Sequence, residues 1–270
     1  MKLFFMHIPK TAGTSFRRFL ERSVRERGGT VSERAADGIW SPDSESYPSY
    51  ADFVANRAEP FRNCDLVSGH YPYHVTAFLD PGTTVVTVLR NALERCVSHV
   101  KHQMALEKQV NGHCETDVNA FLDAPRNRFF LWTIGNLCVK YLSGTGDPDV
   151  VVAPEDLSLD TAVANCCRSL FGFADELPAF QRRLSGVLEA PHAAEFSLRR
   201  ENESVDRFAV ADLSARNRQM LIEQNELDLL LEKLMRRVLA ARLGDSIKAE
   251  GQIAESAGSQ SRPETPRGYM

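Results

Sequence analysis

Residues 3–20 of the chain read LFFMHIPKTAGTSFRRFL, and this stretch sets the architecture of the protein. The apolar run Leu3–Met6 is typical of a buried strand, and apolar residues recur from Phe16 onward at the spacing of one helix face. Residues 7–15 therefore form the turn between a strand and a helix. Because the backbone N–H groups and the dipole at a helix start attract anions, this turn is a candidate anion site.

The side chains of the turn favour the same interpretation. Lys10 supplies a positive charge, and it is followed by hydroxyl-bearing and small residues, namely Thr11, Ala12, Gly13, Thr14 and Ser15. These residues predict a phosphate cradle, and the alternative is an ordinary helix start. The phosphate loop of the NTPases ends in Gly-Lys-Ser/Thr. Here the lysine comes three residues before the glycine of the turn, so a different kind of loop is indicated.

A second motif follows the clearest strand of the chain. Residues 83–89 (TTVVTVL) are rich in β-branched residues, which is typical of a buried strand. Arg90 comes directly after it, and Ser98 lies about two turns into the helix predicted over 92–104. An arginine supplies a fixed charge with forked donors and a serine supplies a directed hydroxyl, although Arg90 could also be a structural ion-pair residue.

A third motif, SGHYPY at residues 68–73, closes the strand predicted over 64–68. His70 is a candidate general base because its ordinary pKa of about 6.5 suits proton transfer near neutral pH. The alternative is a hydrogen-bonded histidine that closes the strand. The carboxyl ends of parallel strands share one rim, so we expect the Lys10 turn, His70 and Arg90 to converge there.

The nine residues HIPKTAGTS resemble the 5′-phosphosulfate loop of the sulfotransferases that use 3′-phosphoadenosine 5′-phosphosulfate (PAPS). The resemblance is closest to the carbohydrate branch, which includes heparan sulfate 2-O-sulfotransferase and its bacterial relatives, and it spans about residues 1–243. It implies a P-loop-like fold and an enzyme that transfers a sulfuryl group from PAPS, its co-substrate, to a hydroxyl of a saccharide or glycolipid. By analogy with phosphoryl transfer we expect an in-line displacement, and a metal is dispensable because Lys10, Arg90 and the helix start offset the negative charge of PAPS.

The resemblance also assigns roles to residues of this chain. Lys10 would contact the oxygen that bridges sulfate and 5′-phosphate, and the rest of the turn would bind the phosphosulfate. Arg90 and Ser98 would grip the 3′-phosphate, and His70 would be the base. The family places Asp-Pro after the arginine, where this chain has Asn91-Ala92. His74 and a carboxylate remain alternatives for the base, and we expect His7 to brace the loop.

Composition limits the partners of the protein. The chain has 270 residues and a net charge of −4, which argues against a broad basic surface for nucleic acid. No apolar run is long enough for a membrane span, and the six cysteines and seven histidines show no metal-ligand spacing, so we expect no metal. Golgi members of the resembled family carry an N-terminal anchor. Because this chain starts at its first strand, we expect a bacterial, cytoplasmic protein, whose oligomeric state the sequence leaves open.

The remaining pattern alternates strands and helices, which predicts an α/β fold with three layers and a central, mostly parallel sheet flanked by helices. A fourth strand is predicted over 149–153, and helices over 161–170 and from Asp212 onward. Residues 244–270 are rich in Ser, Gly, Glu and Pro, so a disordered tail is expected after a domain over 1–243.

Three other functions compete with the carbohydrate sulfotransferase. A sulfotransferase of a small-molecule alcohol would use the same cradle and base. A P-loop-type kinase would use a similar cradle, but the order of lysine and glycine counts against it. A nucleotide-binding protein that has lost catalysis would still bind the phosphate groups but would not transfer a group. Residues 30–60 and 101–135 interrupt the regular pattern and are expected to shape the acceptor pocket.

Overall fold

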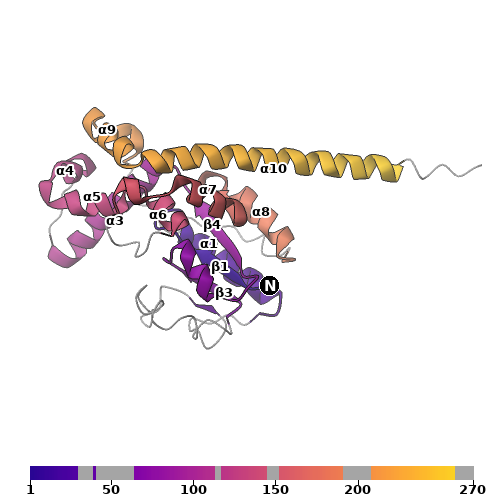
Figure 1. Ribbon diagram of the computed structural model, residues 1–270. Coiled ribbons are helices and arrows are strands. Elements are labelled where there is room, and N and C mark those ends of the chain that lie inside the picture. Colours follow the sequence, from indigo (N-terminus) through magenta and orange to yellow (C-terminus); the bar gives the residue numbers. More distant parts are fainter. Residues whose placement is uncertain (30–38, 41–63, 113–116, 145–151, 191–207, 259–270) are drawn as a thin grey trace, which may run out of the picture.

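The computed structural model describes residues 1–29, 39–40, 64–112, 117–144, 152–190 and 208–258. Within these residues five parallel strands form one sheet in the order β2-β3-β1-β4-β5. The strands are β1 (Leu3–Met6), β2 (Ile39–Trp40), β3 (Leu66–Gly69), β4 (Thr84–Leu89) and β5 (Leu170–Phe173). The expectation of an α/β protein with helices flanking a sheet is confirmed, and the sheet is parallel throughout the described part of the chain (Figure 1).

The helices are α1 (Gly13–Glu26), α3 (Ala92–Asn111), α4 (Val118–Asp123), α5 (Arg128–Ile134), α6 (Leu137–Ser143), α7 (Leu159–Arg168), α8 (Leu177–Val187), α9 (Ala215–Gln224) and α10 (Glu226–Gly258). Short 3-10 helices join them at η3 (Tyr73–Phe78), η4 (Pro125–Asn127), η5 (Pro154–Asp156), η6 (Ala174–Glu176) and η8 (Val210–Asp212). No helix in the described ranges is both long and apolar enough to cross a bilayer.

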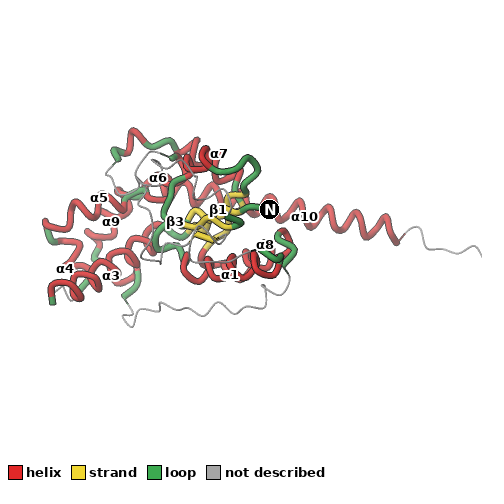
Figure 2. Tube along the Cα trace, turned by 90° about the horizontal axis from the view of Figure 1, so that it is seen from below, coloured by secondary structure: helices red, strands yellow, loops and turns green. Residues whose placement is uncertain are grey.

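Alternation along the strands builds a core on each face of the sheet. Leu3 and Phe5 point to the side covered by α1 and α8, where they pack with Phe16 and Phe180. Phe4 and Met6 point to the opposite side, which α6, α7 and α10 cover. Successive strand residues face opposite sides of a sheet, so three layers result. Figure 2 shows the sheet between α1 and α7.

A third core lies beside the sheet rather than on it. It joins α3, α4, α5 and α9, with Val100, Phe121 and Leu221 among its fully buried members. Figure 1 shows these helices gathered at one side of the sheet, while the far part of α10 extends away from the molecule in both views. Because α3 starts directly after β4, this group of helices adjoins the carboxyl ends of the strands.

The topology places three loops at one rim. β1 lies between β3 and β4, and the three strands are parallel, so the residues after them emerge side by side. After β1 the chain continues to β2, on one side of β1 in the sheet, and after β4 it continues to β5, on the other side. The direction in which strands are added therefore reverses at β1. Ligands of open parallel sheets bind at such a reversal, in the crevice beyond the carboxyl ends.

Two predicted helix boundaries are wrong. The helix predicted over 92–104 continues to Asn111, because residues 105–110 (ALEKQV) are mostly good helix formers, and it ends at Gly112 with φ 70°. The helix predicted over 161–170 spans Leu159–Arg168, and Leu170 instead opens β5 beside β4. Ser158 caps its start by accepting a hydrogen bond from the N–H of Thr161.

The C-terminal predictions also need correction. Asp212 does not start a long helix: it accepts from the N–H of Ala209 in a 3-10 turn, and Ser214 caps the separate helix α9. Residues 244–258, predicted as disordered tail, continue α10, because a helix propagates more easily than it nucleates and each of the three glycines in this segment costs only about 1 kcal/mol. Residues 259–270 lie outside the described residues. So do residues 149–151 of the predicted fourth strand, and residues 152–153 are not a strand.

Candidate functional site

The turn after β1 is held in an unusual backbone conformation. Lys10 and Ala12 have φ angles of 66° and 69°, in the left-handed region that costs a non-glycine residue about 1–2 kcal/mol. Between them, the buried Thr11 donates its hydroxyl hydrogen to the carbonyl oxygen of Ile8 at 2.8 Å. Thr11 therefore braces the loop from within instead of presenting its hydroxyl hydrogen to a ligand. Left-handed residues are typical of the turns in which neighbouring backbone N–H groups face one concavity, and such a concavity suits an anion.

The start of α1 lies in the same turn. The helix begins at Gly13, its N-cap residue Ala12 makes no side-chain cap, and the first turn contains no acidic residue. Helix starts leave backbone N–H groups that need acceptors, and the helix dipole adds partial positive charge. Thr14 and Ser15 are half-buried in this first turn. The backbone and Lys10 thus make this end of α1 electropositive.

His7 fills the space beneath the loop. Its ring stacks on Phe5, with the ring centroids 5.4 Å apart, and lies 4.4 Å from the ring of His70. A Cβ atom on Gly13 would lie 1.7 Å from Nε2 of His7, so the ring requires glycine at that position. Burial, and then the charges of His70, Arg17 and Lys10, hold the pKa of His7 well below its usual value. His7 is a neutral brace between the loop and the base candidate, as the sequence predicts.

His70 directly follows β3 and its side chain is exposed at the rim. Its Nδ1 lies 2.7 Å from the carbonyl oxygen of His7. Because a carbonyl can only accept, Nδ1 carries the hydrogen of the neutral ring, and Nε2 is the basic nitrogen. His74, the alternative base candidate, does not share this contact. It packs instead against Gly144 at the end of α6.

Arg90 ties the end of β4 to the cradle. Its Nη1 donates to the carbonyl oxygen of Lys10 at 3.3 Å, and its Nε lies 3.3 Å from Oε2 of Glu94. Ser98 lies four residues after Glu94 on α3 and is half-buried. Residues four apart share a helix face, so Ser98 lies on the side of α3 that carries the Arg90–Glu94 pair. The structure thus brings Lys10, His70 and Arg90 to one rim.

Two histidines of α3 adjoin this rim as well. His99 is largely buried, with its ring 5.5 Å from that of Phe130 in an edge-on contact. Burial, followed by the charges of Arg95, Lys10, His102 and His70, lowers the pKa of His99 to about 3. Burial and the charge of Lys10 also lower the pKa of His102. The sequence shows that these histidines share a helix face, but not that the face adjoins the cradle.

Lys10 itself is partly buried, and burial lowers its pKa to about 8. Its ammonium group is therefore still charged near neutral pH, in a site that also holds Arg90 and an electropositive helix start. Among the described residues, no group of three His, Cys, Asp or Glu side chains is placed to hold a metal ion. The arrangement can bind a polyanion and accept a proton next to it. No family model and no curated protein matches this chain.

Proposed function

We propose that the protein is a PAPS-dependent sulfotransferase with a P-loop-like fold, which transfers the sulfuryl group to a hydroxyl of a saccharide or glycolipid. The observation that carries the proposal is the juxtaposition of a lysine cradle, an arginine and a histidine base at one rim. Sheet order β2-β3-β1-β4-β5, with the cradle after the central strand, agrees with that fold.

The donor set suits a nucleotide with two separated anionic groups. Lys10 and the start of α1 form one group of donors. Arg90, which contacts the Lys10 carbonyl oxygen from the end of β4, forms with Ser98 of α3 a second group that adjoins the first. Two such groups of donors match the 5′-phosphosulfate and the 3′-phosphate of PAPS. An arginine with forked donors and a helix start both bind phosphate oxygens well.

The proposed chemistry is a single displacement at sulfur. His70 Nε2 takes the proton of the acceptor hydroxyl while the acceptor oxygen forms its bond to sulfur. The bond from sulfur to the 5′-phosphate oxygen breaks, and the Lys10 ammonium stabilises the charge that develops on that oxygen. The products are a sulfate ester and 3′,5′-ADP, and the proton remains on His70 until solvent removes it. The carboxylate of Glu94 is committed to Arg90, so His70 is the stronger candidate for the base.

Direct transfer tests the proposal. The protein is incubated with PAPS and, in separate arms, with oligosaccharides, glycolipids and small-molecule alcohols, and sulfated products are detected by mass spectrometry. We expect product with a carbohydrate acceptor, and loss of product in Lys10→Ala but not in Lys2→Ala. Lys2 is the matched control because it lies before the same strand, at the opposite end of the sheet, paired with Asp80. If sulfated product forms only with small-molecule alcohols, the acceptor is an alcohol and not a carbohydrate. If the protein instead transfers a phosphoryl group from ATP, the proposal is overturned.

A further inference from the structure

Two polar contacts join α10 to the start of α3. Asn91 Nδ2 donates to Oε2 of Glu232 at 3.0 Å, and Arg95 Nη2 donates to Oδ2 of Asp228 at 3.4 Å. Asn91 and Arg95 are four residues apart at the start of α3, and Asp228 and Glu232 are four apart on α10. Each helix therefore presents two groups on one face, one turn apart, and the helices run antiparallel between the contacts.

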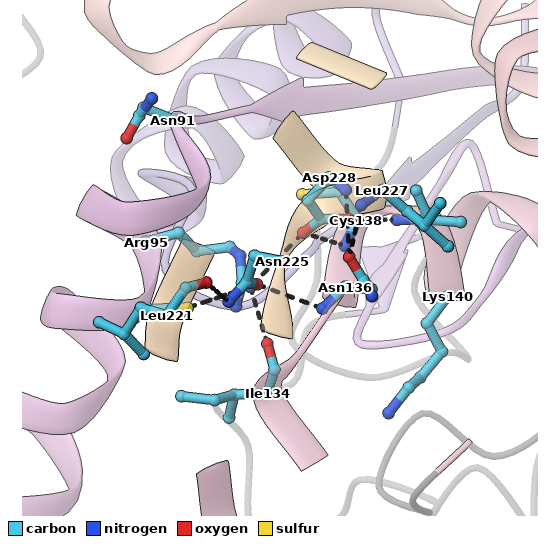
Figure 3. Close-up of polar contacts among 12 residues, drawn as sticks. Asn91, Arg95, Ile134, Asn136, Cys138, Lys140, Leu221, Asn225, Leu227 and Asp228 are labelled. Carbon is cyan, nitrogen blue, oxygen red and sulfur yellow. Dashed lines mark hydrogen bonds and ion pairs between the residues drawn. The ribbon is translucent and has the colours of Figure 1, made fainter. Parts of the chain in front are cut away.

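The contact at Arg95 is completely buried. Figure 3 shows Arg95 projecting from α3 toward Asn225 and Asp228, away from Asn91 at the helix start. Its Nη2 also donates to the carbonyl oxygen of Ile134 at 2.7 Å and to Oδ1 of Asn225 at 2.9 Å. Moving Arg95 away from these acceptors would leave a buried charge uncompensated, so the contacts of Nη2 hold this side of α3 against them.

Asp228 is itself held by a neighbouring helix. It accepts the N–H groups of Cys138 at 3.0 Å and Val139 at 2.8 Å, at the start of α6. In return, Oδ1 of Asn136 accepts the N–H groups of Leu227 and Asp228 at 3.0 and 3.2 Å, at the start of α10. α6 also carries Tyr141, whose hydroxyl donates to the carbonyl oxygen of His70 at 3.4 Å. One buried cluster thus connects α3 with the segment that carries the base candidate.

The side-chain amide of Asn91 makes one hydrogen bond through its oxygen and another through its nitrogen. Oδ1 caps α3 by accepting the N–H of Glu94 at 3.2 Å, while Nδ2 donates to Glu232. Glu232 is also bound by Arg236, whose Nε donates to its Oε1 at 3.0 Å. An aspartate at position 91 could cap the helix but could not donate, and it would face the Glu232 carboxylate. This explains why the chain has asparagine where the resembled family has aspartate.

We propose that Glu232 and Asp228 are positioning residues for the anion grip. Arg90 directly precedes Asn91, and its 3.3 Å contact with the Lys10 carbonyl depends on where the first turn of α3 lies. By fixing Asn91 and Arg95, the two carboxylates of α10 set the place of Arg90 at the rim. The identity of the ligand rests on the proposed function, whereas the placement of α3 does not.

A double-mutant cycle tests the inference with Asn91→Asp, Glu232→Gln and the double variant. The double variant reverses the hydrogen bond without losing it, because the new glutamine amide can donate to the new aspartate carboxylate, which still caps the helix. Amide hydrogen exchange of the first turn of α3 reports its position, and titration with 3′,5′-ADP and with 5′-AMP reports the 3′-phosphate grip. Glu232→Gln alone completes the cycle and measures the loss of the carboxylate while an amide oxygen can still accept from Asn91.

We expect faster exchange in Asn91→Asp and about tenfold weaker binding of 3′,5′-ADP, with a smaller effect on 5′-AMP, which lacks the 3′-phosphate. The double variant should restore both readouts to within about twofold of the original protein. Unchanged exchange in Asn91→Asp, failure of the double variant to rescue, or an equal loss for both nucleotides would overturn the inference. If the original protein does not bind 3′,5′-ADP but the exchange effect appears and is rescued, the proposed function fails and the positioning of α3 stands.

Discussion

Lys10 combines a positive charge with partial burial, and burial lowers its pKa to about 8. In the ligand-free protein the ammonium form is therefore lost above pH 8, whereas a bound anion favours it. We predict that the affinity for 3′,5′-ADP falls as pH rises from 8 toward 9.5, by up to about tenfold per pH unit, with a proton taken up on binding. Phosphate groups titrate near pH 6 and do not contribute in this range.

Calorimetric titration at several pH values, in buffers of different ionisation enthalpy, measures both effects. Lys10→Arg is the control because arginine remains charged throughout, so its affinity should change much less. An affinity of the original protein that is constant from pH 7 to 9.5 would show that Lys10 does not meet the anion.

His70 is held by its Nδ1 contact with the His7 carbonyl oxygen, which leaves Nε2 as the basic nitrogen. Glutamine at position 70 can still donate to that carbonyl but cannot take a proton. We predict that His70→Gln lowers kcat by about a hundredfold to ten-thousandfold and leaves the Kd for 3′,5′-ADP nearly unchanged. His74→Gln is the matched control and should retain most of the activity. Loss of nucleotide binding in His70→Gln would assign His70 a structural role instead.

Gly13 faces the ring of His7, and a Cβ atom there would lie 1.7 Å from Nε2. We predict that Gly13→Ala lowers the free energy of unfolding by about 1–3 kcal/mol, because the ring or the loop must move. In Gly186→Ala, where nothing lies within 4 Å, the change should stay within about 1 kcal/mol. Chemical denaturation measures both, and His7→Ala should recover part of the loss. Equal stability of Gly13→Ala and the original protein would contradict the packing described for His7.

Asp228 joins three helices, because it pairs with Arg95 of α3 and accepts two N–H groups of α6 from its place in α10. Removing one partner of a buried pair leaves the other charge uncompensated. We predict that Asp228→Ala destabilises the protein by about 3–5 kcal/mol. The exposed capping residue Asp212 is the matched control, and Asp212→Ala should cost about 1 kcal/mol. A loss at position 228 no larger than at position 212 would show that the buried cluster does not hold these helices together.

The rim of the sheet could be predicted from the sequence because its signals are local. Lys10, His70 and Arg90 each follow a short apolar run within a few residues, and parallel strands bring such positions to one edge. The edge strand β5 could not be predicted. Its four residues extend the apolar pattern of α7, and they contain Gly172, which is present because the Phe180 ring packs where a Cβ would lie.

The cluster around Arg95 could not be predicted from the sequence for a different reason. Arg95 meets Ile134, Asn225 and Asp228, which are 39, 130 and 133 residues away along the chain. An arginine five residues after Arg90 has no local feature that distinguishes it from a solvated helix residue, yet Arg95 is fully buried. Only tertiary packing shows that it anchors α3.

The whole molecule brings the Lys10 turn after β1, Arg90 after β4 and His70 after β3 to a single rim, and we propose that this rim binds a nucleotide with a 3′-phosphate. The most direct test is calorimetric titration of the full chain with 3′,5′-ADP, with ADP and with ATP at pH 7. We predict that 3′,5′-ADP binds most tightly and that Arg90→Ala reduces this preference. Arg22→Ala is the matched control, because it removes a similar i,i+4 ion pair on α1, and it should leave the preference for 3′,5′-ADP unchanged. Binding of ATP with no binding of 3′,5′-ADP would contradict the claim.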